Sequence, residues 1–82
     1  MRVTYDPEAD AGYIALREIE SGGAKHTVAL GELEPDAAGL EALGSIILDF
    51  DGEERLIGIE VLTASEVLPP ELLREAEPPG RG

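Results

Sequence analysis

Apolar and polar residues alternate along most of the chain from Arg2 to Leu62, and this two-residue period limits the fold more than any other feature. Successive side chains of a β-strand point to opposite faces, so the period predicts strands that are apolar on one face and polar on the other. The alternating runs are RVTYD at 2–6, YIAL at 13–16, AKHTVAL at 24–30, SIILDFD at 45–51 and RLIGIEVL at 55–62. Short strands of this kind are typical of an antiparallel sheet with one buried face.

Turn-forming residues separate these runs. Pro7 has a fixed φ that suits the start of a turn, and the side chains of Asp6 and Asp10 are of the kind that bond backbone amides within turns. The run Ser-Gly-Gly at 21–23 interrupts the chain before the third strand. Asp-Gly at 51–52 accepts positive φ readily, so it predicts a hairpin between the last two strands.

Two segments break the alternation. The acidic, glycine-containing run at 31–44 predicts an inserted loop that holds one helical turn. Farther along, Pro70 suits the first turn of a helix in the run PELLREA. Leu68, Leu72 and Leu73 would then cover one face of the sheet.

We therefore expect a single β-rich domain over residues 1–77, with 31–44 as an inserted acidic loop and 78–82 as a flexible tail. The expected fold class is α+β and mostly β. It is an antiparallel β-meander of about four to five strands with a short C-terminal helix.

The predicted sheet has one strongly apolar face, and a single short helix is too small to cover it. A chain of 82 residues buries only about 60% of the surface that its unfolded form exposes, so its core is thin. We expect the sheet to curl on itself or a second copy to pack against it, and we favour a homodimer. The face comprises Val3, Tyr5, Ile14, Leu16, Val28, Leu30, Ile46, Leu48, Phe50, Ile57, Ile59 and Val61.

The charge of the chain restricts its partners. With 18 acidic and 6 basic residues, the formal net charge is −12. Such a chain repels phosphates, so we expect neither direct nucleic-acid binding nor docking on anionic lipid. An acidic surface suits a basic protein partner, a cation, or solubility alone. The chain also has no cysteine, no signal segment and no apolar run long enough to span a bilayer, so we expect a cytoplasmic protein.

Four carboxylates are candidates for a cation site. Carboxylates two residues apart on a strand share a face, and the expected hairpin pairs their strand with the one that carries Glu60. A hard cation such as Mg²⁺, Mn²⁺ or Ca²⁺ suits such a group, and a metal-dependent hydrolase is the corresponding enzyme class. The simpler alternative is a solvated sheet face, with Glu8 and Asp10 also facing water or Asp10 capping the amides of its own turn. The candidate ligands are Asp6, Asp49, Asp51 and Glu60.

The sequence favours a binding protein over an enzyme. His26 is the only histidine, and Ser21, Ser45 and Ser65 lack the G-x-S-x-G setting of a nucleophilic serine. Ser65 is better explained as the cap of a short helical turn. We therefore expect neither a catalytic residue nor a cofactor.

A second, smaller apolar patch is expected on the opposite face, formed by Tyr13, Ile47 and Leu56 if the strands pair in sequence. It would receive the C-terminal helix and leave the larger face for a dimer, or the helix and the dimer would exchange these faces. Alternatively, the patch is a docking surface for another protein.

Two longer motifs resemble a known family. VTYDPEADAGYIAL at 3–16, and ILDFD followed by RLIGIEVLTAS at 55–65, are similar to the small bacterial and archaeal proteins catalogued as domain of unknown function 2283. Its members begin with Y-D-x-E-x-D-x-x-Y-I-x-L and close with L-D-x-D-x-x-G-x-x-x-G-I-E-I-L-x-A-S. Two features depart from the pattern: the acidic insertion at 31–44, and Glu54 where the closing motif has its first glycine.

The resemblance implies no catalytic residue, because the family has no established activity. Some members lie beside small toxin-like proteins, which implies an antitoxin-like, partner-binding role. An acidic protein that binds a basic partner also agrees with the net charge. The leading hypothesis is therefore a small protein-binding module that dimerises, and the alternative is a divalent-cation-binding protein or metal-dependent hydrolase.

Overall fold

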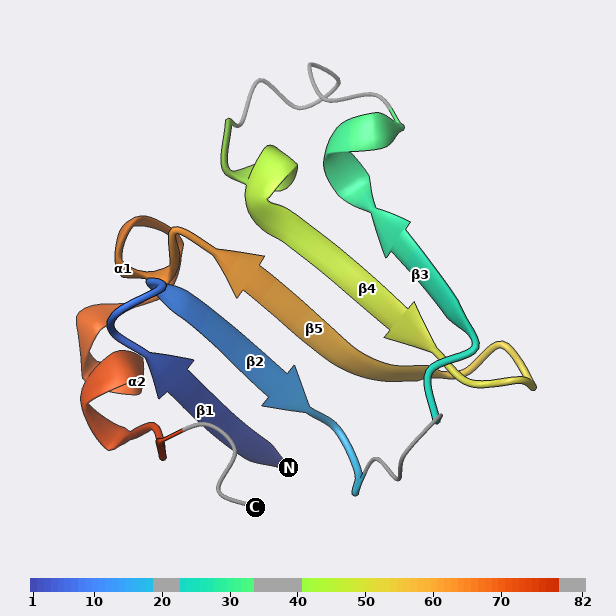
Figure 1. Ribbon diagram of the computed structural model, residues 1–82, viewed down its shortest axis with the longest axis horizontal. Helices are drawn as coiled ribbons and strands as arrows, with labels where there is room; N and C mark the ends of the chain where they lie inside the picture. Colours follow the sequence, from blue (N-terminus) through green and yellow to red (C-terminus); the bar gives the residue numbers. More distant parts are fainter. Residues whose placement is uncertain (19–22, 34–40, 79–82) are drawn as a thin grey trace.

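The computed structural model describes residues 1–18, 23–33 and 41–78, and all structural statements below refer to these ranges. Its elements form a five-stranded antiparallel sheet in the order β1-β2-β5-β4-β3, followed by two short helices (Figure 1). The strands are β1 (Arg2–Asp6), β2 (Ala11–Ala15), β3 (His26–Ala29), β4 (Ile46–Phe50) and β5 (Leu56–Leu62). The helices are α1 (Ala64–Val67) and α2 (Pro70–Glu75), and two 3-10 turns are η1 (Leu30–Glu32) and η2 (Glu41–Ser45).

The predicted fold class is confirmed, and the strand order adds one feature to it. β1 and β2 form a hairpin, and β3, β4 and β5 follow one another as a meander. The two units join because β2 pairs with β5, not with β3. β5 is thereby the central strand. Alternation identifies the face on which a side chain lies, but not which strands are neighbours, and so it did not predict this pairing.

The predicted apolar face is present, and its side chains are aligned across the sheet. The strand register places one apolar residue from each strand in a single cross-strand row. This row consists of Val3, Ile14, Ile59, Leu48 and Val28. Neighbouring side chains in such a row contact one another and stabilise the pairing of their strands.

The helix α1 packs on this apolar face over β2 and β5. A Cβ atom at Gly12 would lie 3.4 Å from Leu68 Cδ1 and 3.5 Å from Ala64 Cβ, so a glycine leaves room for the helix. Gly12 is opposite Tyr5 on β1 and Val61 on β5, which places it on the apolar face. The expectation that Leu68 covers this face is therefore confirmed.

The outer edge of β1 is covered by the end of the C-terminal segment. Glu77 forms a parallel bridge with Thr4: its amide donates to Val3 O and its carbonyl accepts from Tyr5 N, both at 2.9 Å. Arg2 and Glu77 add an exposed ion pair at 2.9 Å. The expected tail at 78–82 lies almost entirely outside the described residues.

The hairpin predicted between β4 and β5 is confirmed. Asp51 N donates to Arg55 O at 2.9 Å, and Glu54 N donates to Asp51 O at 3.0 Å. A three-residue loop closed in this way needs a left-handed residue at its last position. Glu54 takes that conformation, with φ 67°. It stands where the family motif has a glycine.

Few side chains are fully buried. Among the described residues, the buried hydrophobic ones are Ile57, Val61 and Ala64, which belong to β5 and α1. Within the same part of the chain, each helix is too short to cross a membrane. The core is therefore centred on the middle strand and on the helix that follows it.

Candidate functional site

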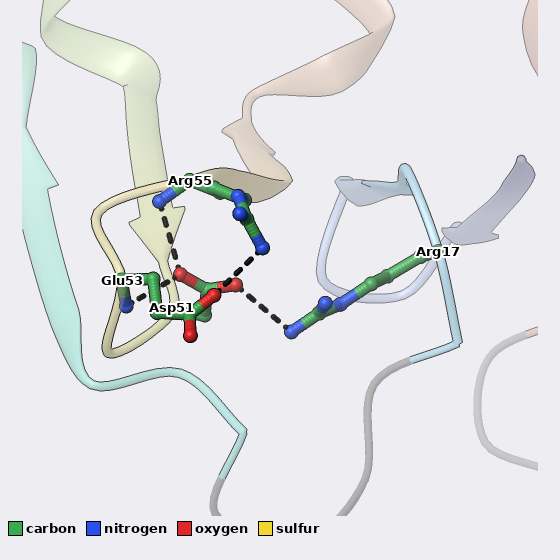
Figure 2. Close-up of polar contacts among 4 residues, drawn as sticks. All are labelled: Arg17, Asp51, Glu53 and Arg55. Atoms are coloured by element: carbon green, nitrogen blue, oxygen red, sulfur yellow. Dashed lines mark hydrogen bonds and ion pairs between the residues drawn. The ribbon is translucent and has the colours of Figure 1, made fainter.

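Asp51 organises the hairpin loop (Figure 2). Its Oδ1 accepts the amides of Glu53 at 2.8 Å and Arg55 at 3.0 Å, and its Oδ2 contacts the Arg17 guanidinium at 3.1 Å. The bond from the Arg55 amide, then that from Glu53, and the charges of Arg17 and Arg55 hold the pKa of Asp51 below its usual value, against the effect of burial. The Asp51 side chain is only 10% exposed, and its oxygens are occupied by the loop amides and by Arg17.

Asp49 lies on the polar face of the sheet and connects three strands. Its Oδ2 accepts from the Tyr13 hydroxyl at 2.8 Å, and its Oδ1 accepts from Thr27 Oγ1 at 2.9 Å. The Tyr13 side chain reaches it by lying over Gly58, where a Cβ would overlap the ring and hydroxyl. Burial, followed by the hydrogen bond to Asp49, raises the pKa of Tyr13. A tyrosine with a raised pKa keeps its hydroxyl hydrogen, which it donates in the hydrogen bond to the Asp49 carboxylate.

Glu60 lies between two apolar side chains on the same face. In the strand register it is opposite Tyr13 on β2 and Ile47 on β4. We call the surface formed by Tyr13, Ile47, Asp49 and Glu60 the polar sheet face. Each of these residues is partly exposed. A carboxylate flanked by an aromatic ring and an aliphatic side chain is suited to a guanidinium or ammonium group.

Asp10 forms a contact that sequence reasoning missed. Instead of facing water or capping its own turn, its Oδ1 accepts from the Tyr5 hydroxyl at 2.7 Å and from Ser65 N at 2.9 Å. Its Oδ2 accepts from Ser65 Oγ at 2.7 Å, and its carbonyl accepts from Ala64 N at 2.9 Å. Asp10 thus caps the first turn of α1. Ser65, which the sequence predicted as the cap, lies inside that helix and donates its amide to Asp10.

The pKa values of this group follow from the same contacts. The Ser65 hydroxyl, followed by Tyr5, holds the pKa of Asp10 below its usual value. The hydrogen bond to Asp10 raises the pKa of Tyr5. A signal was present in the sequence, because Tyr5 and Asp10 belong to the opening motif and Ser65 ends the closing one. The two motifs meet in space at this point.

The four candidate metal ligands are not brought together. Asp49 and Glu60 share the polar sheet face, whereas Asp51 is engaged by its own loop. Asp6 lies on the far edge strand, opposite Ala11, and accepts the amide of Glu8 at 3.0 Å. Two strands, β2 and β5, separate it from β4. Within the described ranges, no group of three or more His, Asp or Glu side chains has a geometry that would hold a metal ion.

The residues of the predicted second patch also separate into two places. Tyr13 and Ile47 flank Glu60, as the register shows. Leu56 is opposite Phe50, next to an irregularity in the β4–β5 pairing. α1 and Leu68 pack on the larger apolar face, away from the patch around Tyr13 and Ile47. His26 is exposed, and with Phe50 and Glu54 it lines a shallow hollow.

The apolar face divides into two halves. The covered half, around Gly12 and Val61, lies under α1. The open half consists of Val28, Leu48, Phe50 and Ile59, each of which keeps part of its surface exposed. Figure 1 shows α1 and α2 gathered on the β1 side of the sheet, with neither helix crossing β4 or β3. Within the described ranges, α1 covers one half of the face and neither helix lies over the other, where Ile57 of β5 is nevertheless buried.

The family motifs coincide with these contacts. Their residues include the Tyr5–Asp10–Ser65 group, the Tyr13–Asp49–Gly58 group and the loop carboxylate Asp51. No curated protein and no solved structure matches the chain. Residues 2–65 match the model of a family described as a protein of unknown function (DUF2283), and the chain belongs to that family.

Proposed function

We propose that the chain is a cytoplasmic protein-binding module that takes a basic protein partner on its polar sheet face. The observation that supports this most is the excess of negative charge after internal pairing. Of the 6 basic residues, Arg2, Arg17 and Arg55 pair with carboxylates of the chain itself. The 6 basic residues can balance at most 6 of the 18 acidic ones, and the remaining net charge of −12 attracts a partner of opposite charge.

The polar sheet face offers a specific place for such a partner. Both oxygens of Asp49 already accept hydrogen bonds from Tyr13 and Thr27. Glu60, in contrast, makes no side-chain hydrogen bond within the described residues, and it lies beside the Tyr13 ring. An arginine side chain can stack on a tyrosine ring while its guanidinium bonds a neighbouring carboxylate. Ile47 on the other side of Glu60 would exclude water from that pair.

A divalent cation is less well supported as the ligand. The carboxylates that would bind it are dispersed, because Asp51 serves its loop and Asp6 lies at the far edge of the sheet. Asp49 and Glu60 alone provide fewer oxygen ligands than Ca²⁺ or Mg²⁺ requires. Binding of a basic side chain, in contrast, needs only one carboxylate beside apolar groups, as Glu60 is beside Tyr13 and Ile47.

The test begins with capture of the tagged protein from its native host in 150 mM NaCl. A basic protein recovered there is purified, and its affinity is measured for the wild type and for two variants of equal charge. Glu60→Gln should weaken binding by about tenfold or more, because it removes a charge flanked by apolar groups. Glu71→Gln, on the exposed surface of α2, should change it by less than about threefold. Equal losses in both variants, or recovery of no basic protein, would contradict the proposal.

A further inference from the structure

We infer that a second copy of the chain covers the open half of the apolar face, so that the protein is a homodimer with sheet packed on sheet. The inference starts from the cross-strand row of apolar side chains described above. Val28, Leu48 and Ile59 form its uncovered end, and Phe50 adjoins them. Adjacent apolar side chains that each keep part of their surface exposed are suited to an interaction site in a soluble protein.

The exposed area is of the size that an interface requires. The chain exposes 5670 Å², whereas the usual scaling of surface with mass gives about 4,700 Å² for a monomer of 8.7 kDa. The excess is about 1,000 Å², and one partner in a standard interface buries about 800 Å². The molecule is flat, at 36 × 32 × 18 Å.

The chemistry of the open half selects a copy of the same chain. Val28, Leu48, Phe50 and Ile59 carry no charge, and Glu54 adjoins this surface only at its loop end, beside Phe50, so its centre gives a basic partner no charge to pair with. An identical apolar face is complementary to it under two-fold symmetry. Sheets that pack in this way lie about 10 Å apart with interdigitating side chains. The polar sheet face then remains outside the dimer, available to the partner proposed above.

The charge predicts how the dimer responds to salt. Each copy carries −12, so the two repel one another, and added salt screens that repulsion. Dimerisation should therefore strengthen between 50 mM and 500 mM NaCl. Binding of a basic partner should weaken over the same range, because it depends on attraction between opposite charges. The opposite responses distinguish a failure of one proposal from a failure of the other.

Sedimentation equilibrium tests the inference with two adjacent residues of β4. The wild type at tens of micromolar should have the mass of two chains. Leu48→Gln, on the open half, should shift the protein to the mass of one chain at the same concentration. Ile47→Gln, on the opposite face of the same strand, should leave the dimer intact. Far-UV circular dichroism establishes that both variants are folded.

Three results would overturn the inference. One is a wild type with the mass of one chain at 500 mM NaCl and the highest concentration measured, which would leave the open half to a different protein or to the chain itself. Another is equal dissociation by the two β4 variants. If Leu48→Gln does not fold, Val28→Lys on the edge strand β3 replaces it, with Thr27→Lys as its control on the opposite face. A folded Val28→Lys that remains a dimer is the third overturning result.

Discussion

The two halves of the apolar face come from the same alternating strands, yet the helices of the described part of the chain cover only one of them. In the covered half, Val61 and Ala64 are 2% and 0% exposed, because α1 packs over Gly12. In the open half, Leu48 and Phe50 keep part of their surface exposed. Alternation determines which face is apolar, whereas the elements after the sheet determine how much of that face is buried.

The largest expected effect comes from truncating one apolar residue of the sheet face in each half. Val61→Ala should lower the free energy of unfolding by about 2 kcal/mol, which lowers Tm by about 10 °C, because a cavity forms in the covered half. This fall should be the same at every protein concentration. Leu48→Ala should lower Tm mainly at high concentration, because its loss includes the contact with the second copy. Thermal melts over a hundredfold concentration range measure both.

The comparison between the halves fails if the two variants behave alike. A Leu48→Ala fall that is independent of concentration would mean that the open half contributes only within one chain. The wild type itself provides the control, since its Tm should rise with concentration.

An intermediate effect is expected in acid, and it involves a carboxylate from each half. Asp10 holds α1 over the covered half, and Asp51 holds the loop at the end of the open half. Both have pKa values below their usual 3.8, so the unfolded chain binds more protons as pH falls. The stability that they contribute is present above about pH 4 and is lost as pH falls through their lowered values. Tm measured from pH 6 to pH 2 should therefore decrease most steeply below pH 4.

Variants of the two carboxylates test whether Asp10 and Asp51 cause the decrease of Tm in acid. Asp10→Asn and Asp51→Asn should each lower Tm by several degrees at pH 7 and flatten its decrease in acid. Glu71→Gln, with an equal change of charge on α2, should do neither. An unchanged slope in both Asn variants would mean that other carboxylates control the acid response.

The smallest expected effect is a gain in stability. Glu54 has a left-handed φ of 67° at the position where the family motif has glycine. Glu54→Gly should raise the free energy of unfolding by about 0.5–1 kcal/mol, because the relief of strain exceeds the added entropy of the unfolded chain. Glu53→Gly, in the same loop but without positive φ, should lower it. Chemical denaturation measures both, and a loss for Glu54→Gly would contradict the account of this loop.

Much of the fold follows from the sequence by local rules. The faces of the strands, the hairpin at Asp51 and the helix that begins at Pro70 each depend on residues close together in the chain. The strand order does not follow from local rules, because β2 pairs with β5, which lies far from it in the sequence. For the same reason the capping of α1 by Asp10 was missed: its partner Ser65 is 55 residues away.

The candidate site was predicted only in part, for a related physical reason. The spacing of Asp49 and Asp51 indicated two carboxylates on one sheet face. Asp51 instead bonds the amides of the loop that it begins, which removes it from that face. A carboxylate at the start of a turn has backbone donors within reach, so local hydrogen bonds outweigh the strand period there.

The pairing of β2 with β5 has a consequence for the order in which the chain folds during synthesis. The β1–β2 hairpin leaves the ribosome first, but a two-stranded hairpin alone is only marginally stable in water. Its neighbour in the sheet, β5, and the helix that Asp10 caps are made later. The first hairpin must therefore wait until β5 is made, and a ribosome that stops before β5 releases a product with no stable sheet around β1 and β2.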